Sequence, residues 1–281
     1  MKLVFRKLRS FPAPIRILVF ALLLLSLWLP FALPLNWLMR DRNLAGILTL
    51  LILYTQFIGL VRYWGRNIHR QPQVFRSYGL ELSRQNGLLV LRGLGMGLFS
   101  VLFLFGFETL MGWIQWRSPS WNTLQIIVEG LIVSLALGFA EELLFRGWML
   151  DELQRDYTPT VALWANAVLF AALHLRLATF PALVLLGAAL VWAKRSHSRV
   201  HLGRRYALLG LPIGLHAGLV YGNYIIEVGK LIQYTDRVPA WVTGIDRNPL
   251  AGLLGVLFMA ALAVSMWRYS KLQAAQASPK L

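Results

Sequence analysis

The chain has 281 residues, of which 57% are hydrophobic and only 14% are charged, a composition typical of polytopic membrane proteins rather than of soluble domains. Lysine and arginine outnumber aspartate and glutamate by 28 to 12, but the basic residues lie between apolar segments, which favours a membrane protein over a nucleic-acid-binding one. The absence of cysteine excludes disulfides, thiolate nucleophiles and cysteine-ligated metals. We therefore expect an integral, multi-pass protein with one membrane domain over residues 1–281 and no nucleic-acid partner.

The first apolar segment follows a basic head, residues 1–16, as in a secretory signal peptide. No small-residue cleavage site closely follows the apolar run, so we expect an uncleaved first span. Pro30 and Pro34 are expected to kink or end this span, because proline removes a helical hydrogen bond.

Eight segments are long or apolar enough to cross a bilayer, which takes roughly 17 to 25 helical residues. The sequence therefore predicts an all-α bundle of about eight transmembrane helices. The expected spans are Pro14–Leu35, Leu44–Val61, Leu88–Ile114, Thr123–Phe145, Thr160–Leu175, Leu177–Ala193, Tyr206–Val228 and Pro249–Trp267.

The distribution of basic residues orients these spans. Lysine and arginine concentrate in the head, in residues 62–84 and 194–205 and in the tail, so both termini are predicted to be cytoplasmic. The turn after the fourth span departs from this pattern because it is acidic on balance. Residues 62–87, in which arginines and aromatic residues alternate, are either a positively charged inner loop, which we favour, or an amphipathic helix on the anionic lipid surface.

The fourth span contains three charged residues, Glu141, Glu142 and Arg146. Each charge in a bilayer costs at least about 2.5 to 3.5 kcal/mol, so the three need partners or a function. Glu142 and Arg146 are four residues apart and share one helix face. One arginine therefore neutralises one glutamate, and Glu141 is left without its own cation.

Two histidines are predicted to lie near Glu141. The chain turns back at Asp156–Pro159, and Glu141 and His174 are equally far from that turn, so an antiparallel helix pair places them at the same depth. His216 lies on the seventh span, and Asn223 follows on the same helix face. One carboxylate and two imidazoles from three spans can activate water and stabilise an oxyanion, although an ion pair and packed histidines can also be structural.

Other classes of intramembrane protease are disfavoured by elimination. The chain has no His-Glu-x-x-His run for a zinc protease. The serines within the spans lack a glycine-flanked turn, and every aspartate falls in a loop. A glutamate with histidines remains.

These residues resemble the motifs of the CAAX protease and bacteriocin-processing (CPBP, ABI or Rce1-like) intramembrane proteases. Glu141, Glu142 and Arg146 match the Glu-Glu-x-x-x-Arg motif, Phe170 and His174 match Phe-x-x-x-His, and His216 matches the histidine of a later helix. The motif-bearing core spans about residues 122–268. Four residues after this later histidine the family commonly has asparagine or aspartate. This chain has Val220 there, and helical geometry makes Asn223 the candidate substitute.

The resemblance implies hydrolysis of a peptide bond within or near the cytoplasmic leaflet. If the roles of the family's motif residues apply to the matching positions here, Glu141 and His174 activate water and His216 stabilises the oxyanion. Glu142 and Arg146 then keep the site residues in position. Members are described as glutamate proteases or as metal-dependent. We favour no cofactor, with zinc held by Glu141, His174 and His216 as the alternative. The implied partners are membrane lipid and a peptide or membrane-protein substrate, including lipidated ones.

Two other functions fit the same polar residues. A non-catalytic membrane adaptor keeps the family fold without the chemistry, and the Val220 departure slightly favours it. A small transporter uses carboxylates and histidines as proton relays, but the sequence contains no inverted repeat and no pair of broken helices.

Overall fold

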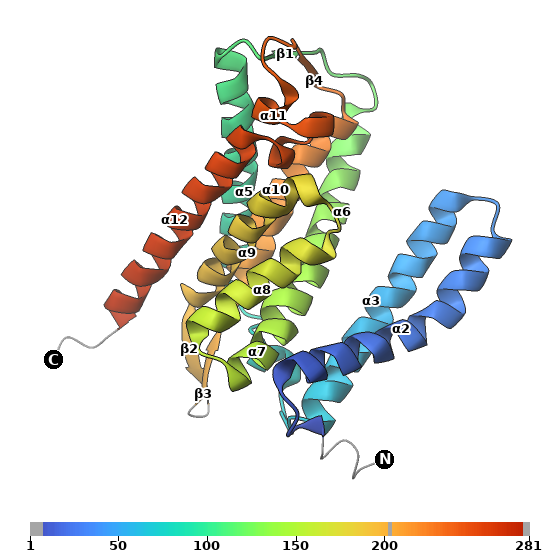
Figure 1. The fold of residues 1–281 in the computed structure, drawn as a ribbon, viewed down its shortest axis with the longest axis vertical. Helices are drawn as coiled ribbons and strands as arrows, with labels where there is room; N and C mark the ends of the chain where they lie inside the picture. The colour runs from blue at the N-terminus through green and yellow to red at the C-terminus, as the bar shows by residue number, and fades with distance from the viewer. Residues whose placement is uncertain (1–7, 202–203, 278–281) are drawn as a thin grey trace.

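The computed structural model describes residues 8–201 and 204–277, and these are mainly helical (Figure 1). The all-α prediction is confirmed, since the strands form only two short antiparallel ribbons in loops. In chain order the elements are α2 (Ala13–Leu38), α3 (Arg42–Asn67), α4 (Val74–Ser77), α5 (Arg84–Leu110), β1 (Ile114–Trp116), α6 (Thr123–Glu142), the π-helix η1 (Leu143–Met149), α7 (Leu150–Asp156), α8 (Pro159–Leu173), the 3₁₀ turn η2 (Leu177–Thr179), α9 (Phe180–Arg195), β2 (Ser198–His201), β3 (Arg204–Ala207), α10 (Gly210–Val228), β4 (Ile232–Tyr234), α11 (Ala240–Thr243), the 3₁₀ turns η3 (Ile245–Arg247) and η4 (Pro249–Ala251), and α12 (Leu253–Ala277).

The protein is an integral, multi-pass membrane protein. Within the described part of the chain, 6 helices are long and apolar enough to span a membrane: Ala13–Leu38, Leu44–Asn67, Arg84–Leu110, Thr123–Asp156, Leu177–Arg195 and Leu253–Gln276. The other two expected spans are helices as well, but α8 has only 15 residues and α10 carries many small and polar residues. The number of spans and the cytoplasmic termini therefore stay predictions.

The prolines of the first span do not end it. Helix α2 contains both Pro30 and Pro34 and continues to Leu38, and Figure 1 shows it bending along its length. Proline is tolerated in transmembrane helices because local adjustments satisfy the backbone groups that it frees.

Helix α10 lies at the centre of the bundle, tightly packed against α5. A Cβ added at Gly93 or Gly97 of α5 would lie only 2.4 Å from a backbone carbonyl of α10. Helix α6 also approaches α10 closely, because a Cβ at Gly138 would lie 2.9 Å from the Ile213 carbonyl. Such small residues let helix backbones meet in membranes. Gly138 thereby brings the next turn of α6, with Glu141, to the side of His216.

The segment from residue 62 to 87 is not one amphipathic helix. Helix α3 takes up its first part as far as Asn67, and only the short helix α4 follows before α5 begins. Gly79, with φ of 95°, adopts a left-handed conformation that ends regular structure before α5.

The β2–β3 ribbon is fixed to the chain before α5 through Glu81. The Tyr206 hydroxyl donates to Glu81 Oε2 over 2.6 Å, and Arg199 donates to Oε1 over 3.2 Å. The hydrogen bond from Tyr206, with the charges of Arg199 and Arg76, holds the pKa of Glu81 below its ordinary value.

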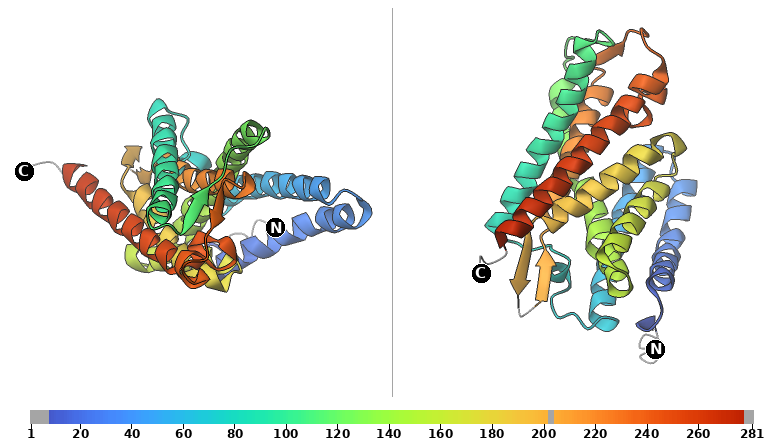
Figure 2. Two further views of the ribbon diagram at one scale, coloured as in Figure 1. Left: turned by 90° about the horizontal axis from the view of Figure 1, so that it is seen from above. Right: turned by 60° about the vertical axis from the view of Figure 1, so that its left-hand side comes forward.

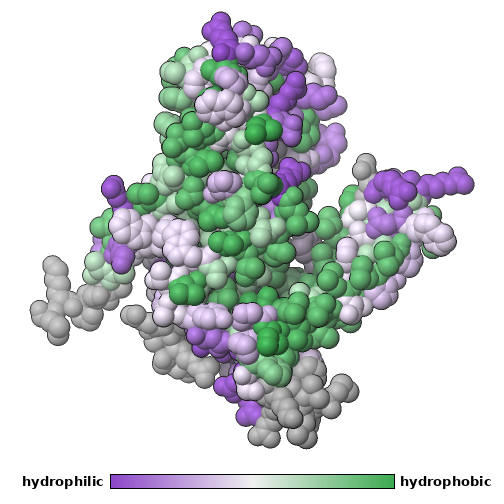
Figure 3. All heavy atoms as spheres, viewed as in Figure 1, coloured by the Kyte–Doolittle hydropathy of each residue, from purple (hydrophilic) through white to green (hydrophobic). Residues whose placement is uncertain are grey.

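Helices α2 and α3 form an N-terminal hairpin that stands to one side of the bundle (Figures 1 and 2). The space-filling view shows hydrophobic residues over the middle of the bundle and along the hairpin, and a gap between them towards the hairpin tip (Figure 3). The main contacts that tie the hairpin to the rest of the protein are those of α2 with α7 and of α3 with α4.

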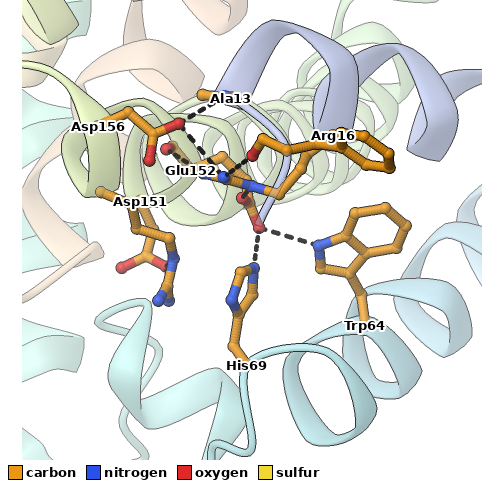
Figure 4. A network of polar contacts seen from close by, with 9 residues as sticks. Ala13, Arg16, Trp64, His69, Asp151, Glu152 and Asp156 are labelled. Carbon is orange, nitrogen blue, oxygen red and sulfur yellow. Dashed lines mark hydrogen bonds and ion pairs between the residues drawn. The ribbon is translucent and has the colours of Figure 1, made fainter. Parts of the chain in front are cut away.

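A buried polar cluster around Glu152 anchors the hairpin base (Figure 4). The Glu152 carboxylate, on α7, accepts hydrogen bonds from Arg16 Nε at 2.7 Å, Trp64 Nε1 at 2.9 Å and His69 Nε2 at 2.5 Å. Asp156 accepts from the Ala13 backbone N–H at 2.6 Å. The acidic turn that departed from the positive-inside pattern is thus explained by its partners on α2 and α3.

We predict that Glu152→Leu releases the hairpin from the bundle. Arg16 is 2% exposed, and losing one partner of a buried ion pair costs up to about 3–5 kcal/mol, less here because Arg16 Nη1 also lies 3.2 Å from Asp156 Oδ2. Amide hydrogen exchange is expected to accelerate in α2 and α3 but not in α5 and α10. Asp151→Asn is the matched control, because the pair of Asp151 with Arg155 is partly exposed and contributes little. Uniform acceleration over all helices would contradict an anchoring role.

Candidate active site

A partly open cavity of about 400 Å³ brings together the three residues predicted to be catalytic, Glu141, His174 and His216. Glu141 Oε2 lies 3.9 Å from Nε2 of His174 and 3.9 Å from Nε2 of His216. The three side chains come from α6, the end of α8 and α10, as the hairpin geometry and the helix spacing predicted.

Glu141 is placed to hold a water molecule. Its side chain is 22% exposed, and its Oε2 atom is buried and accepts no hydrogen bond from any described residue. A separation of 3.9 Å is too long for a direct hydrogen bond, but one water at about 2.8 Å from both atoms bridges it. The cavity can therefore place a water between the carboxylate and either imidazole.

The imidazoles of His174 and His216 are each oriented by a contact at Nδ1, the ring nitrogen that does not face Glu141. His174 Nδ1 lies 2.7 Å from the Phe170 carbonyl oxygen, and His216 Nδ1 lies 2.8 Å from Glu142 Oε1. Both oxygens are acceptors, so each Nδ1 carries the hydrogen and donates. Each Nε2 is then directed at Glu141.

Glu142 and Arg146 form the ion pair that the sequence predicted, and both side chains are fully buried. Arg146 Nη1 donates to Glu142 Oε1 over 2.9 Å, and its Nη2 donates to the Gly187 carbonyl over 3.2 Å. Its guanidinium also lies 4.2 Å from the ring centre of Phe170. The same Glu142 oxygen binds His216, a contact that spacing along the chain did not reveal.

The helix that carries these residues continues beyond the expected span Thr123–Phe145 to Asp156, and its middle, η1, is a π-helix. A π-turn breaks the regular α-helical hydrogen-bond pattern, and such turns are frequent at functional sites. Two of its carbonyls are bound by other helices: Phe145 O accepts from Asn166 Nδ2 at 2.8 Å, and Arg146 O accepts from Lys194 Nζ at 2.5 Å. Asn166 thus makes an interhelical hydrogen bond, and Lys194, which falls in the basic segment 194–205 expected to lie between spans, is buried on α9.

We predict that Lys194→Met lowers activity more than stability. The Arg146 carbonyl loses its donor, which costs about 1–3 kcal/mol, and the π-turn that positions Glu141 and Glu142 relaxes. Peptide-release rates and denaturant midpoints measure the two effects. Arg195→Gln is the control, since that side chain donates its hydrogen bond to the exposed Pro159 carbonyl and not to the π-turn. Equal losses of activity in Lys194→Met and Arg195→Gln would show that Lys194 does not position the π-turn.

Val220 and Asn223 both line the cavity. Val220 has no polar group to offer a substrate, so Asn223 is the amide available on that helix. The lining continues along α10 to Glu227 and reaches Leu250 in η4.

The cavity lies towards one end of the bundle. It follows α10 from His216 to Val228, away from the start of α2 and the end of α12 and towards β1 and β4 (Figure 1). Helices α8 and α9 are short and meet partway up the bundle (Figure 1), and the cavity lining also includes Leu250 of η4 and Phe258 and Met259 of α12.

The residues as placed do not fit a zinc ion. Tetrahedral zinc with bonds of about 2.0–2.1 Å holds its ligand atoms roughly 3.3 Å apart, less than the 3.9 Å found on either side of Glu141 Oε2. Among the described residues no group of three histidine, aspartate, glutamate or cysteine side chains could hold a metal.

In a comparison with known protein families, the matching region of this chain is the segment that carries the motifs. Residues 123–222 match the family model described as "Type II CAAX prenyl endopeptidase Rce1-like", a range that includes all three motifs and Val220 but ends just before Asn223. No curated protein and no solved structure matches the chain. The family match confirms the resemblance found in the motifs: residues 123–222 are an Rce1-like segment, which supports a CAAX-protease-like intramembrane endopeptidase.

Proposed function

We propose that this protein hydrolyses a peptide bond inside the membrane with a water molecule activated by Glu141 and His174. The observation that carries the proposal is the unpaired Glu141 Oε2, which lies 3.9 Å from two oriented imidazole nitrogens in a largely apolar cavity. A carboxylate with little solvent around it is an effective general base.

The steps follow from the placement of the groups. Water held between Glu141 and His174 Nε2 gives a proton to the Glu141 carboxylate as its oxygen attacks the carbonyl carbon. The proton then passes to the leaving amine, and the C–N bond breaks. His216, protonated at Nε2, donates to the oxyanion, while the Glu142 carboxylate bound at Nδ1 stabilises the positive charge on the ring.

The substrate class follows from the cavity walls and the family match. Most of the lining is apolar, with contributions from Leu104, Phe105, Leu219 and Met259, so an apolar segment of a membrane protein or a lipidated peptide fits. The match to prenyl endopeptidases supports the same class. No cofactor is required in this proposal.

The test is a search for new peptide termini in cell membranes containing the wild-type protein or Glu141→Gln. Hydrolysis in ¹⁸O-labelled water places one ¹⁸O atom in each new carboxylate, which mass spectrometry detects. Termini that are labelled only with the wild type are expected, and their source proteins are the substrates. Identical sets of termini from the two proteins would rule the proposal out.

A non-catalytic adaptor is the second candidate, favoured by Val220 at the place where the family commonly has a polar side chain. An adaptor retains the same partner proteins with and without Glu141 and cleaves none of them. Co-purification from the same two membranes distinguishes the two functions.

A further inference from the structure

A second cavity, of about 260 Å³, lies between the end of α3 and α4 and is lined by three arginines, Arg62, Arg66 and Arg76. Gln73, Val74 and Phe75 also contribute to its wall, and no acidic side chain does. The protease proposal makes no use of this pocket.

The positive charge in the pocket is only partly balanced. Arg62 and Arg66 are exposed and form no ion pair or hydrogen bond with any residue in the described ranges. They lie four residues apart on one helix face, where like charges repel. Arg76 is partly satisfied, because its Nε lies 3.7 Å from Glu81 Oε2 and its Nη1 lies 3.5 Å from Gln73 Oε1. A bound anion would relieve the repulsion between Arg62 and Arg66 and accept hydrogen bonds from their guanidinium groups.

The pocket is held in place by close packing of α4 on α3. A Cβ at Gly65 would lie 2.6 Å from Val74 Cγ1, so the two segments touch directly. Val74 is buried and Phe75 half-buried, which gives the pocket an apolar side next to its guanidinium groups.

The position of the pocket selects the anion. Arg62 and Arg66 lie in the last two turns of the membrane-spanning helix Leu44–Asn67, and lipid phosphates lie at the level where such a helix leaves the hydrocarbon. Guanidinium groups bind phosphate oxygens through paired hydrogen bonds, and basic pockets beside transmembrane helices bind anionic headgroups. We propose that this pocket binds the phosphate group of an anionic phospholipid at that surface of the membrane.

Native mass spectrometry of the detergent-solubilised full chain tests the proposal by titration with dioleoylphosphatidylglycerol or dioleoylphosphatidylcholine. One phosphatidylglycerol is expected to bind more tightly than phosphatidylcholine, and each arginine removed is expected to weaken it about 5-fold. The variants are Arg62→Gln/Arg66→Gln, and Gln73→Glu, which puts a negative charge into the pocket without removing an arginine.

The control is Arg84→Gln/Arg268→Gln, which removes the same charge from exposed positions outside the pocket. It is expected to keep the preference for phosphatidylglycerol. Equal binding of the two lipids, or equal weakening in control and pocket variants, would overturn the proposal. Competition by inorganic phosphate at the same phosphate concentration as the lipid would assign the pocket to a soluble anion instead.

Discussion

Glu141→Gln is expected to lower the rate of peptide hydrolysis by about 10²–10⁴-fold, the range that a general base contributes. Glutamine has nearly the same shape but cannot accept the proton of the attacking water. Folding is expected to be unaffected, because Glu141 Oε2 has no partner to lose. Peptide release from a substrate identified by its labelled termini measures the rate, and thermal unfolding measures the stability.

Glu129→Gln is the control for this substitution. Glu129 lies on the same helix, is exposed and bonds only to Gln125, over 2.6 Å. It is expected to keep full activity. Wild-type activity in Glu141→Gln would show that residue 141 is not the base.

Glu142→Ala is expected to destabilise the protein by about 3–5 kcal/mol, because it strands the buried Arg146 charge. Both side chains are 0% exposed, so water does not replace the lost partner. The folded yield and the denaturant midpoint are both expected to fall. Unchanged stability would mean that the pair does not hold α6 in place.

The double variant Glu142→Leu/Arg146→Met separates the structural role of the pair from its role at the site. Replacing both charges with apolar side chains of similar size is often neutral for stability, so most of the loss is expected to be recovered. Activity is not expected to be recovered, since His216 Nδ1 no longer has its carboxylate acceptor. Restored activity in the double variant would contradict the orienting role of Glu142.

The overall plan of the fold could be predicted because it depends on local properties of the sequence. Span length and apolarity set the helices, and Pro159 begins α8 as the turn required. Equal distances from that turn then placed Glu141 beside His174. The catalytic roles drawn from the family resemblance stay predictions, since position alone does not assign chemistry.

The contacts that could not be predicted depend on how each helix is rotated about its axis and on which groups far apart in the sequence come into contact. Nothing within the sequence near Glu142 indicates that its carboxylate binds His216, and nothing near Lys194 indicates that its amine binds the Arg146 carbonyl. His69 likewise lies in the segment 62–87 expected to be an inner loop, but its side chain is buried against Glu152. These buried polar groups obtain partners from segments far along the chain, which only the three-dimensional structure specifies.

The glycine contacts between α5 and α10 have a consequence for how a substrate is admitted. Backbones that touch directly leave no side chains to rearrange between the two helices, so α5 and α10 cannot shift against each other and His216 is held at a fixed depth. The facing wall is built of longer side chains, among them Leu183, Phe258 and Met259, which can change rotamer. When a bulky substrate enters, the cavity is therefore expected to widen on the side of α9 and α12, while the His216 imidazole on α10 keeps its position.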